Sequence, residues 1–176
     1  MNRAALPDGG VISTDRLILR PPAYRDGPAL HRLLSDPKNF YFSPQAPLAE
    51  LAYTRFMIVE WAERRSHGFL TFLAARKGWD EQPIGLLHVG ADEEIGGFLS
   101  DQASGRGLAS EGLQAVVTAL DLRQAWTIID AEHLALIHLL SKVSILPAER
   151  LPSYRVHPQI SAQKRDCVLL RQQEAA

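Results

Sequence analysis

The residues with the clearest chemical potential form a glycine-containing turn between an apolar strand and an amphipathic helix. The turn reads Gln102-Ala103-Ser104-Gly105-Arg106-Gly107-Leu108-Ala109-Ser110. The first N–H groups of a helix have no intrahelical partner, and the helix dipole adds partial positive charge there. Glycines let the backbone approach an anion without a Cβ in the way. The turn therefore suits a phosphate or pyrophosphate, although two glycines alone indicate a plain tight turn more often than an anion site.

Two common nucleotide-binding motifs are excluded at this turn. A Walker loop ends in Gly-Lys-Ser/Thr, which is missing here, and the third glycine of a Rossmann motif is replaced by Ser110. If the turn binds phosphate, it belongs to another class of site.

The amino-acid composition excludes further classes of function. The 176 residues suit one domain with its own core, and 19 basic against 20 acidic residues leave no basic field for nonspecific nucleic-acid binding. No apolar run has the length of a signal peptide or a membrane span. Cys167 is the only cysteine, so an intrachain disulfide is excluded, and its apolar neighbours indicate a core residue. We expect a soluble, cytoplasmic protein without a nucleic-acid or membrane partner.

The elements that must position the turn are those of a mixed α/β protein. Residues 1–13 resemble a loose leader, and residues 14–176 a single domain. Asp26 is placed to cap the first helix, and Pro147 to end the last. Hydrophobic periodicity predicts strands at 16–20, 69–76, 84–89, 94–99, 126–130, 151–157 and 166–171. Helices are predicted at 26–36, 48–66, after Gly107, and at 132–143.

Several segments resemble a known family. Gln102-x-x-Gly105-x-Gly107-x-Ala109 is similar to the Q/R-x-x-G-x-G/A pyrophosphate motif of the GNAT acyltransferase superfamily. The flanks resemble its RimJ/RimL-type N-acetyltransferase branch, in order along the chain: TDRLILRPP at 14–22, LLSDP at 33–37, PIGLLHVG at 83–90, EIGGFLS at 94–100, GRGLASEGL at 105–113 and KRDCVLL at 164–170. The resemblance implies a GNAT fold, in which a mixed central sheet of about seven strands splays after the fourth strand and about four helices flank it.

The same resemblance implies a ligand and its contacts. Acetyl-CoA is the expected co-substrate, and a primary amine of a small molecule or a protein N-terminus is the expected acceptor. A strand amide near Leu99 would polarise the thioester carbonyl. The amine would attack directly, so catalysis would rest on positioning two substrates. The implied cofactor-binding residues are Phe98, Leu99, Ser100, Gln102, Gly105, Arg106, Gly107, Leu108, Ala109 and Ser110.

Two residues are candidates for proton transfer. Glu94 begins the fourth strand, where relatives often carry a carboxylate that takes the amine proton. His133 has an ordinary pKa of ~6.5, so a neutral imidazole there can accept a proton or pass one to a thiolate. A solvated strand-end charge for Glu94, and a surface group or cap for His133, remain open alternatives.

The family pattern changes in the later part of the chain. His133 stands for an expected asparagine, Leu136 for a serine, and Ser144-Ile145 for a Gly-Phe pair. These changes leave a second hypothesis open, a catalytically impaired GNAT-fold module that binds CoA or a partner. The six histidines show no ligand spacing, so no metal is expected. An exposed C-terminal strand would favour pairing with a second copy, which makes a homodimer an expectation.

Overall fold

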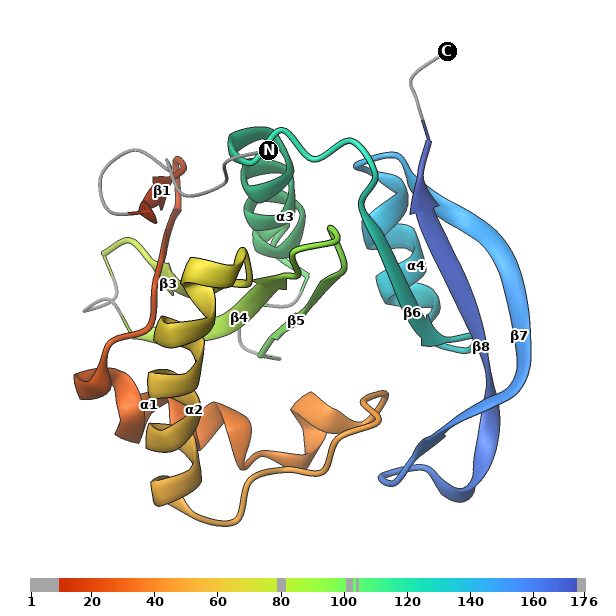
Figure 1. Cartoon of the computed structure of the whole chain (residues 1–176), viewed down its shortest axis with the longest axis horizontal. Helices are drawn as coiled ribbons and strands as arrows, with labels where there is room; N and C mark the ends of the chain where they lie inside the picture. The colour runs from red at the N-terminus through yellow and green to blue at the C-terminus, as the bar shows by residue number, and fades with distance from the viewer. Residues whose placement is uncertain (1–9, 79–81, 101–102, 104, 174–176) are drawn as a thin grey trace.

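The computed structural model describes residues 10–78, 82–100, 103 and 105–173 (Figure 1). The strands are β1 (Ile12–Ser13), β2 (Leu17–Arg20), β3 (Leu70–Arg76), β4 (Pro83–Val89), β5 (Ile95–Leu99), β6 (Trp126–Asp130), β7 (Ile145–His157) and β8 (Ser161–Gln172). The α-helices are α1 (Gly27–Leu34), α2 (Leu51–Arg64), α3 (Leu108–Ala119) and α4 (Leu134–Ser141). Short 3-10 turns are η2 (Tyr24–Asp26), η3 (Pro37–Phe40) and η4 (Arg65–His67).

The strands form two sheets that diverge from one another. The first has the order β1-β2-β3-β4-β5 and the second the order β6-β8-β7, with antiparallel neighbours throughout. Helices α1 and α2 lie on one side of the first sheet, while α3 and α4 lie between and behind the two sheets (Figure 1). This is the GNAT fold, with the sheet splayed after the fourth long strand, as the resemblance implied.

Strand β3 explains how the first sheet is held between helices. Six of its seven residues, LTFLAAR, are buried, because both faces of the sheet are covered. Leu73 and Ala75 pack with α1 and α2, while Phe72 and Ala74 pack with α3 on the opposite face. The alternation of a strand thus divides its side chains between two cores.

The two sheets meet at the start of β5 and β6. Glu94 forms an isolated parallel bridge with Trp126, and Trp126 N donates to Glu93 O at 3.2 Å. The Glu93 carboxylate accepts from the amides of Arg123 (3.0 Å) and Gln124 (2.7 Å), and Trp126 Nε1 donates to Asp92 O. Beyond this junction β5 and β6 diverge (Figure 1), and among the described residues no strand pairs with that edge of β5; we call the region between the two strands the gap.

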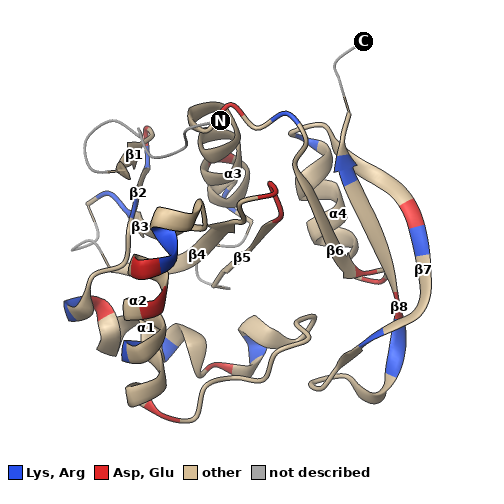
Figure 2. Cartoon of the chain, in the orientation of Figure 1, with Lys and Arg blue, Asp and Glu red and all other residues tan. Residues whose placement is uncertain are grey.

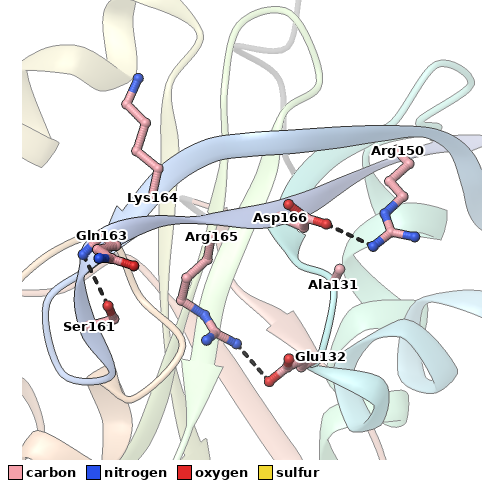
Figure 3. Close-up of a pocket in the computed structure, with 8 residues that line it drawn as sticks. All are labelled: Ala131, Glu132, Arg150, Ser161, Gln163, Lys164, Arg165 and Asp166. Carbon is pink, nitrogen blue, oxygen red and sulfur yellow. Dashed lines mark hydrogen bonds and ion pairs between the residues drawn. The ribbon is translucent and has the colours of Figure 1, made fainter.

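A buried carboxylate organises the second sheet. Asp130 is 0% exposed and accepts hydrogen bonds at Oδ2 from His157 Nδ1 and Arg165 Nε, both at 2.6 Å, and at Oδ1 from the Glu132 amide. Arg165 also donates to Glu132, as Figure 3 shows. Burial opposes ionisation of Asp130, but these hydrogen bonds, led by Arg165, outweigh it and lower its pKa to about 2. The network fixes the turn from β6 into α4.

A pocket of about 280 Å³ lies beside this network (Figure 3). Its charged lining is largely paired within the protein, Arg165 with Glu132 and Arg150 with Asp166. Lys164 extends away from Arg165 on the other side of the strand (Figure 3). The remaining lining residues are Ala131, Ser161 and Gln163. We therefore assign this pocket to the scaffold.

The last predicted helix was placed wrongly at both ends. It spans Leu134–Ser141 rather than 132–143, and Pro147 lies inside β7 instead of ending the helix. The break comes at Ser144, which has φ +61°. This left-handed conformation suits the glycine that the family carries there. Pro147 is tolerated because β7 is an edge strand.

Two other expectations change in detail. The C-terminal strand β8 lies between β6 and β7, so it offers no free edge for a second copy. Ile12 and Ser13, expected in the leader, pair with β2. Asp26 does occupy the N-cap position of α1, but its carboxylate binds the Arg20 guanidinium and the Ala23 amide.

Cys167 is fully buried in β8, as its apolar neighbours predicted. Burial raises the pKa of its thiol, so the group stays protonated at neutral pH. Among the described residues, no helix has both the length and the apolar character needed to cross a membrane.

The two glycines of β5 provide a test of how closely β4 and β5 pack. Gly97 has φ +135°, and a Cβ there would lie 2.2 Å from Leu86 O, whereas a Cβ on Gly96 meets nothing within 4 Å. We expect Gly97→Ala to lower the free energy of unfolding by more than about 2 kcal/mol, because strain and overpacking add. Gly96→Ala, the control, should change it by less than about 1 kcal/mol. Urea denaturation checks both, and equal stability of the two variants would contradict this packing.

The Asp130 network predicts a defined acid sensitivity. A folded-state pKa of about 2, against an ordinary value of 3.8, means that Asp130 stabilises the fold above pH 4 and that this stabilisation is lost as pH falls from 4 to 2. The loss amounts to roughly 2 kcal/mol. Asp130→Asn should remove this part of the pH dependence and cost about 3 kcal/mol at pH 7.

The control for this prediction is Asp166→Asn, which removes the solvent-exposed partner of Arg150 on the same hairpin. Denaturation at pH 7 and pH 3 should show a much smaller change for this variant. Equal losses for the two variants would mean that the buried network is no more important than a surface ion pair.

Candidate functional site

The turn before α3 forms an open backbone cradle. Gly105 and Gly107 have φ of +71° and +73°, and Gly107 occupies the N-cap position without a side-chain cap. A Cβ on Gly105 would meet nothing within 4 Å, and one on Gly107 only the Arg16 guanidinium at 3.5 Å. Apart from that guanidinium, none of the described residues fills the space beside these two glycines, as an anion site requires.

The implied cradle residues divide between surface and core. Arg106 is exposed, Ala109 and Ser110 are half-buried, and Leu108 is 2% exposed and anchors the helix in the core. Gln102, the first residue of the motif, lies outside the described residues. The assignment of these residues to cofactor binding stays a prediction.

An ion-pair clamp ties the cradle to β2. The Glu111 carboxylate accepts from Thr14 Oγ1 at 2.5 Å, from the Arg16 amide at 2.9 Å and from Arg16 Nε at 2.6 Å. Arg16 Nη1 also donates to Arg106 O at 2.8 Å. Burial opposes ionisation of Glu111, but the hydrogen bonds from Thr14 and Arg16 outweigh it and lower its pKa. The clamp holds the loop at Arg106 against the first turn of α3.

A second cation reaches the cradle from α4. Lys142, the C-cap residue of α4, lies with Nζ 3.5 Å from Ser110 Oγ in the first turn of α3. A lysine beside a helix N-terminus adds positive charge to an already positive end. Together with Arg16 and Arg106 it outweighs the Glu111 carboxylate, so among the described residues this end of α3 carries net positive charge that attracts a multiply charged anion.

Strand β5 presents backbone groups to the gap between the sheets. Ser100 N donates to Ile84 O at 2.8 Å, and Glu94 O accepts from Gly90, so even-numbered residues face the β4 side. The β4–β5 register is unbroken, so the odd-numbered groups of Ile95, Gly97 and Leu99 face the β6 side. There the described residues supply no paired strand beyond the Glu94 bridge.

Phe98, Leu99 and Ser100, which the resemblance implies as cofactor-binding residues of this strand, therefore differ in orientation. Leu99 directs its backbone groups to the gap, whereas Ser100 is buried and its N–H and C=O bind Ile84 and Ala103. The Phe98 side chain packs toward α1 and α2, with its ring 5.9 Å from that of Phe40.

The two proton-transfer candidates lie at opposite ends of β6. Glu94 is exposed beside Trp126, where the sheets join. His133 follows the other end of β6, and the strand alone spans about 13 Å. The structure therefore does not bring Glu94 and His133 into one cluster, and each role stays a separate prediction.

His133 has a partner that its sequence neighbours did not reveal. Its ring is stacked on Phe42, with centroids 4.3 Å apart and planes inclined by 18°. Both side chains are half-buried, and His133 is the N-cap residue of α4. Burial lowers the pKa of His133, against an opposing effect of Asp130, so the imidazole is neutral at pH 7. His138 is exposed on the same helix.

Sequence reasoning missed Arg16 and Lys142 as neighbours of the cradle, and Phe42 as the stacking partner of His133. Glu111 carried a usable local indication, because acidic residues favour the first turn of a helix. Nothing local pointed to the others, since each reaches the site from a distant segment. Within the described part of the chain, no three His, Cys, Asp or Glu side chains gather as potential metal ligands.

Charge around the gap is mixed. Acidic residues mark the start of β5 and the β6–α4 turn, while basic and acidic residues are interspersed along β7 and β8 (Figure 2). The local concentration of positive charge at the start of α3 thus comes from the three residues named above, not from a basic surface.

Comparison with known proteins assigns the chain to a protein family. The family model described as an acetyltransferase (GNAT) domain matches residues 16–144. Among curated protein sequences, none matches with significance. The structure of RimL, a ribosomal L7/L12 alpha-N-protein acetyltransferase in complex with coenzyme A, is similar with a TM-score of 0.80 and 20% identity. The similarity covers 92% of this chain and 97% of that one.

Two further structures give the same result. The Salmonella typhimurium acetyltransferase that modifies the N-terminal serine of ribosomal protein L7/L12 has a TM-score of 0.80 and 18% identity, covering 94% and 99% of the chains. Mycobacterium smegmatis RimJ in complex with CoA-disulfide has a TM-score of 0.74 and 20% identity, covering 88% and 80%. At such identities these likenesses show the fold, while the domain match shows the family. The chain belongs to the GNAT family of acetyltransferases.

Proposed function

We propose that this acetyltransferase moves the acetyl group of acetyl-CoA to a primary amine, on a protein N-terminus or a small molecule. The observation that carries the proposal is the open cradle at Gly105–Ser110, beside a strand whose odd-numbered backbone groups face a gap. RimL binds coenzyme A in its structure, and the Salmonella relative modifies an N-terminal serine. These neighbours favour the peptide amine as the first acceptor to test.

The positions of the cradle and of β5 imply the direction in which acetyl-CoA would lie along the strand. Backbone amides from Gly105 to Ser110 would hold the pyrophosphate, with Arg16 and Lys142 adding positive charge nearby. The cradle follows the end of β5, so an arm paired with that strand leads back from Leu99 toward Ile95 and Glu94. An amide of Leu99 or of its odd-numbered neighbours would polarise the thioester carbonyl.

The acceptor has to lose a proton before its nitrogen attacks. Glu94 is the proposed base, because it begins β5 and is exposed where β5 and β6 join. His133, neutral and stacked on Phe42, is the alternative group for moving a proton. The new N–C bond forms as the C–S bond breaks, and the departing thiolate takes up a proton.

The second hypothesis, a module without transfer chemistry, has one structural observation in its favour. Leu136, which replaces the serine of relatives, packs partly buried against the main core and offers no hydroxyl. Turnover separates the two hypotheses, because a module without transfer chemistry would bind acetyl-CoA but would not cleave its thioester bond to release CoA.

Acetyl-CoA turnover is therefore the first measurement. We expect calorimetry to show binding with a dissociation constant between about 1 μM and 1 mM, the usual range for enzyme substrates. We also expect CoA release above the enzyme-free rate with at least one of a set of amines that includes peptides with N-terminal serine. Absence of binding at acetyl-CoA concentrations above about 1 mM would refute the proposal, and binding without release would favour the module.

Gly107→Leu tests where the pyrophosphate lies. A leucine side chain would enter the open cradle and reduce CoA affinity more than tenfold, while its left-handed φ costs about 1–2 kcal/mol of stability. Gly78→Leu is the matched control, since Gly78 has φ +74° and equally open surroundings in the β3–β4 turn. It should lose similar stability in denaturation and keep CoA affinity in calorimetry. Unchanged affinity in Gly107→Leu would place the phosphate elsewhere.

A further inference from the structure

The two halves of the molecule touch again beyond the gap. At one end, backbone hydrogen bonds join β5 to β6 through Glu93 and Trp126. At the other, Phe42, from the segment between η3 and α2, stacks on His133 at the start of α4. In Figure 1 these two segments approach one another below the diverging strands β5 and β6. The first contact includes backbone hydrogen bonds, whereas the second is a stacked pair of rings.

The backbone near each of the two rings is held by contacts with the rest of the protein. Phe42 follows Phe40, which is 5% exposed in the core formed with α1 and α2. His133 N donates to Asp130 O at 3.0 Å, and Asp130 belongs to the buried network of the second sheet. The ring contact therefore joins the segment after η3 to the start of α4, beside a core that the two sheets share, and it can break while that core stays intact.

The free energy of a ring contact is small, so the contact can break and re-form frequently. A stacked ring pair favours the joined state by about 2- to 12-fold. A backbone ladder would hold the parts together permanently, whereas this pair leaves a minor open population. A third ring lies alongside, because Tyr41, itself 50% exposed, packs edge-on against Phe42 with centroids 5.0 Å apart.

A transferase that holds a thioester must keep water from its carbonyl. In hydrolysis, a water oxygen forms the C–O bond as the C–S bond breaks, which yields acetate, CoA thiol and a proton. Closing the site suppresses this side reaction, while the acceptor amine needs the same entrance.

We propose that the Phe42–His133 ring pair closes the gap at the end away from the Glu94–Trp126 bridge and that Phe42 thereby selects amine transfer over thioester hydrolysis. This inference rests on the proposed function. Phe42 touches no reacting atom, so we describe it as a specificity-determining residue. This role does not depend on whether His133 transfers a proton.

The first experiment tests the contact without any substrate. In proton–carbon NMR of the wild-type protein, the imidazole resonances of His133, assigned by their loss in His133→Gln, should be shifted upfield by the Phe42 ring. Phe42→Ala should remove that shift, and Phe42→Tyr should retain it. Identical His133 resonances in the wild type and Phe42→Ala would overturn the proposal.

The second experiment measures CoA release from acetyl-CoA without any amine. Phe42→Ala should raise this rate by roughly 2- to 12-fold, the population ratio expected for a ring stack, with unchanged acetyl-CoA affinity. Phe42→Tyr should behave as wild type. Phe56→Ala is a matched control, because Phe56 is a 60% exposed phenylalanine that lies on α2. It too should leave the rate unchanged.

An unchanged or lower hydrolysis rate in Phe42→Ala would overturn the proposal even where the wild type binds and turns over acetyl-CoA. A wild type that does not bind acetyl-CoA would instead refute the proposed function. The NMR comparison stands on its own in either case.

Discussion

The architecture depends on a single short junction between two sheets. Glu93 accepts the amides of Arg123 and Gln124 with its carboxylate and that of Trp126 with its carbonyl, and one β-bridge follows. Because the strands part immediately afterwards, β5 keeps unpaired backbone groups along one edge without becoming an outer strand of the molecule. A longer ladder would have filled that edge with β6, and a missing junction would have left two separate sheets.

The polar groups of the site are positioned by partners at long sequence range. Arg16 and Glu111 connect β2 to the cradle, and Asp130 fixes the turn that carries His133. Each carboxylate is held ionised by hydrogen bonds that outweigh its burial. The cradle can stay open and free of side chains because these neighbouring ion pairs, rather than contacts within it, hold its shape.

Local patterns in the sequence predicted most strands and helices and the position of the cradle, because periodicity and glycine placement act over a few residues. They failed at Pro147, where tolerance depends on β7 being an edge strand, a property of the whole sheet. They also failed to find Lys142 beside Ser110 and Phe42 on His133, since those contacts join segments 32 residues and more apart. The sequence shows a serine instead of a glycine at position 144. In the structure this serine adopts a left-handed backbone conformation, which glycine would adopt with less strain.

The burial of Cys167 has a practical consequence. It is the only cysteine in the chain, and the native fold encloses it completely. Reagents that quantify free CoA by its thiol will therefore record no contribution from folded protein. The same side chain becomes reactive only when β8 leaves the sheet, so its labelling rate reports opening of the second sheet directly, without any engineered probe.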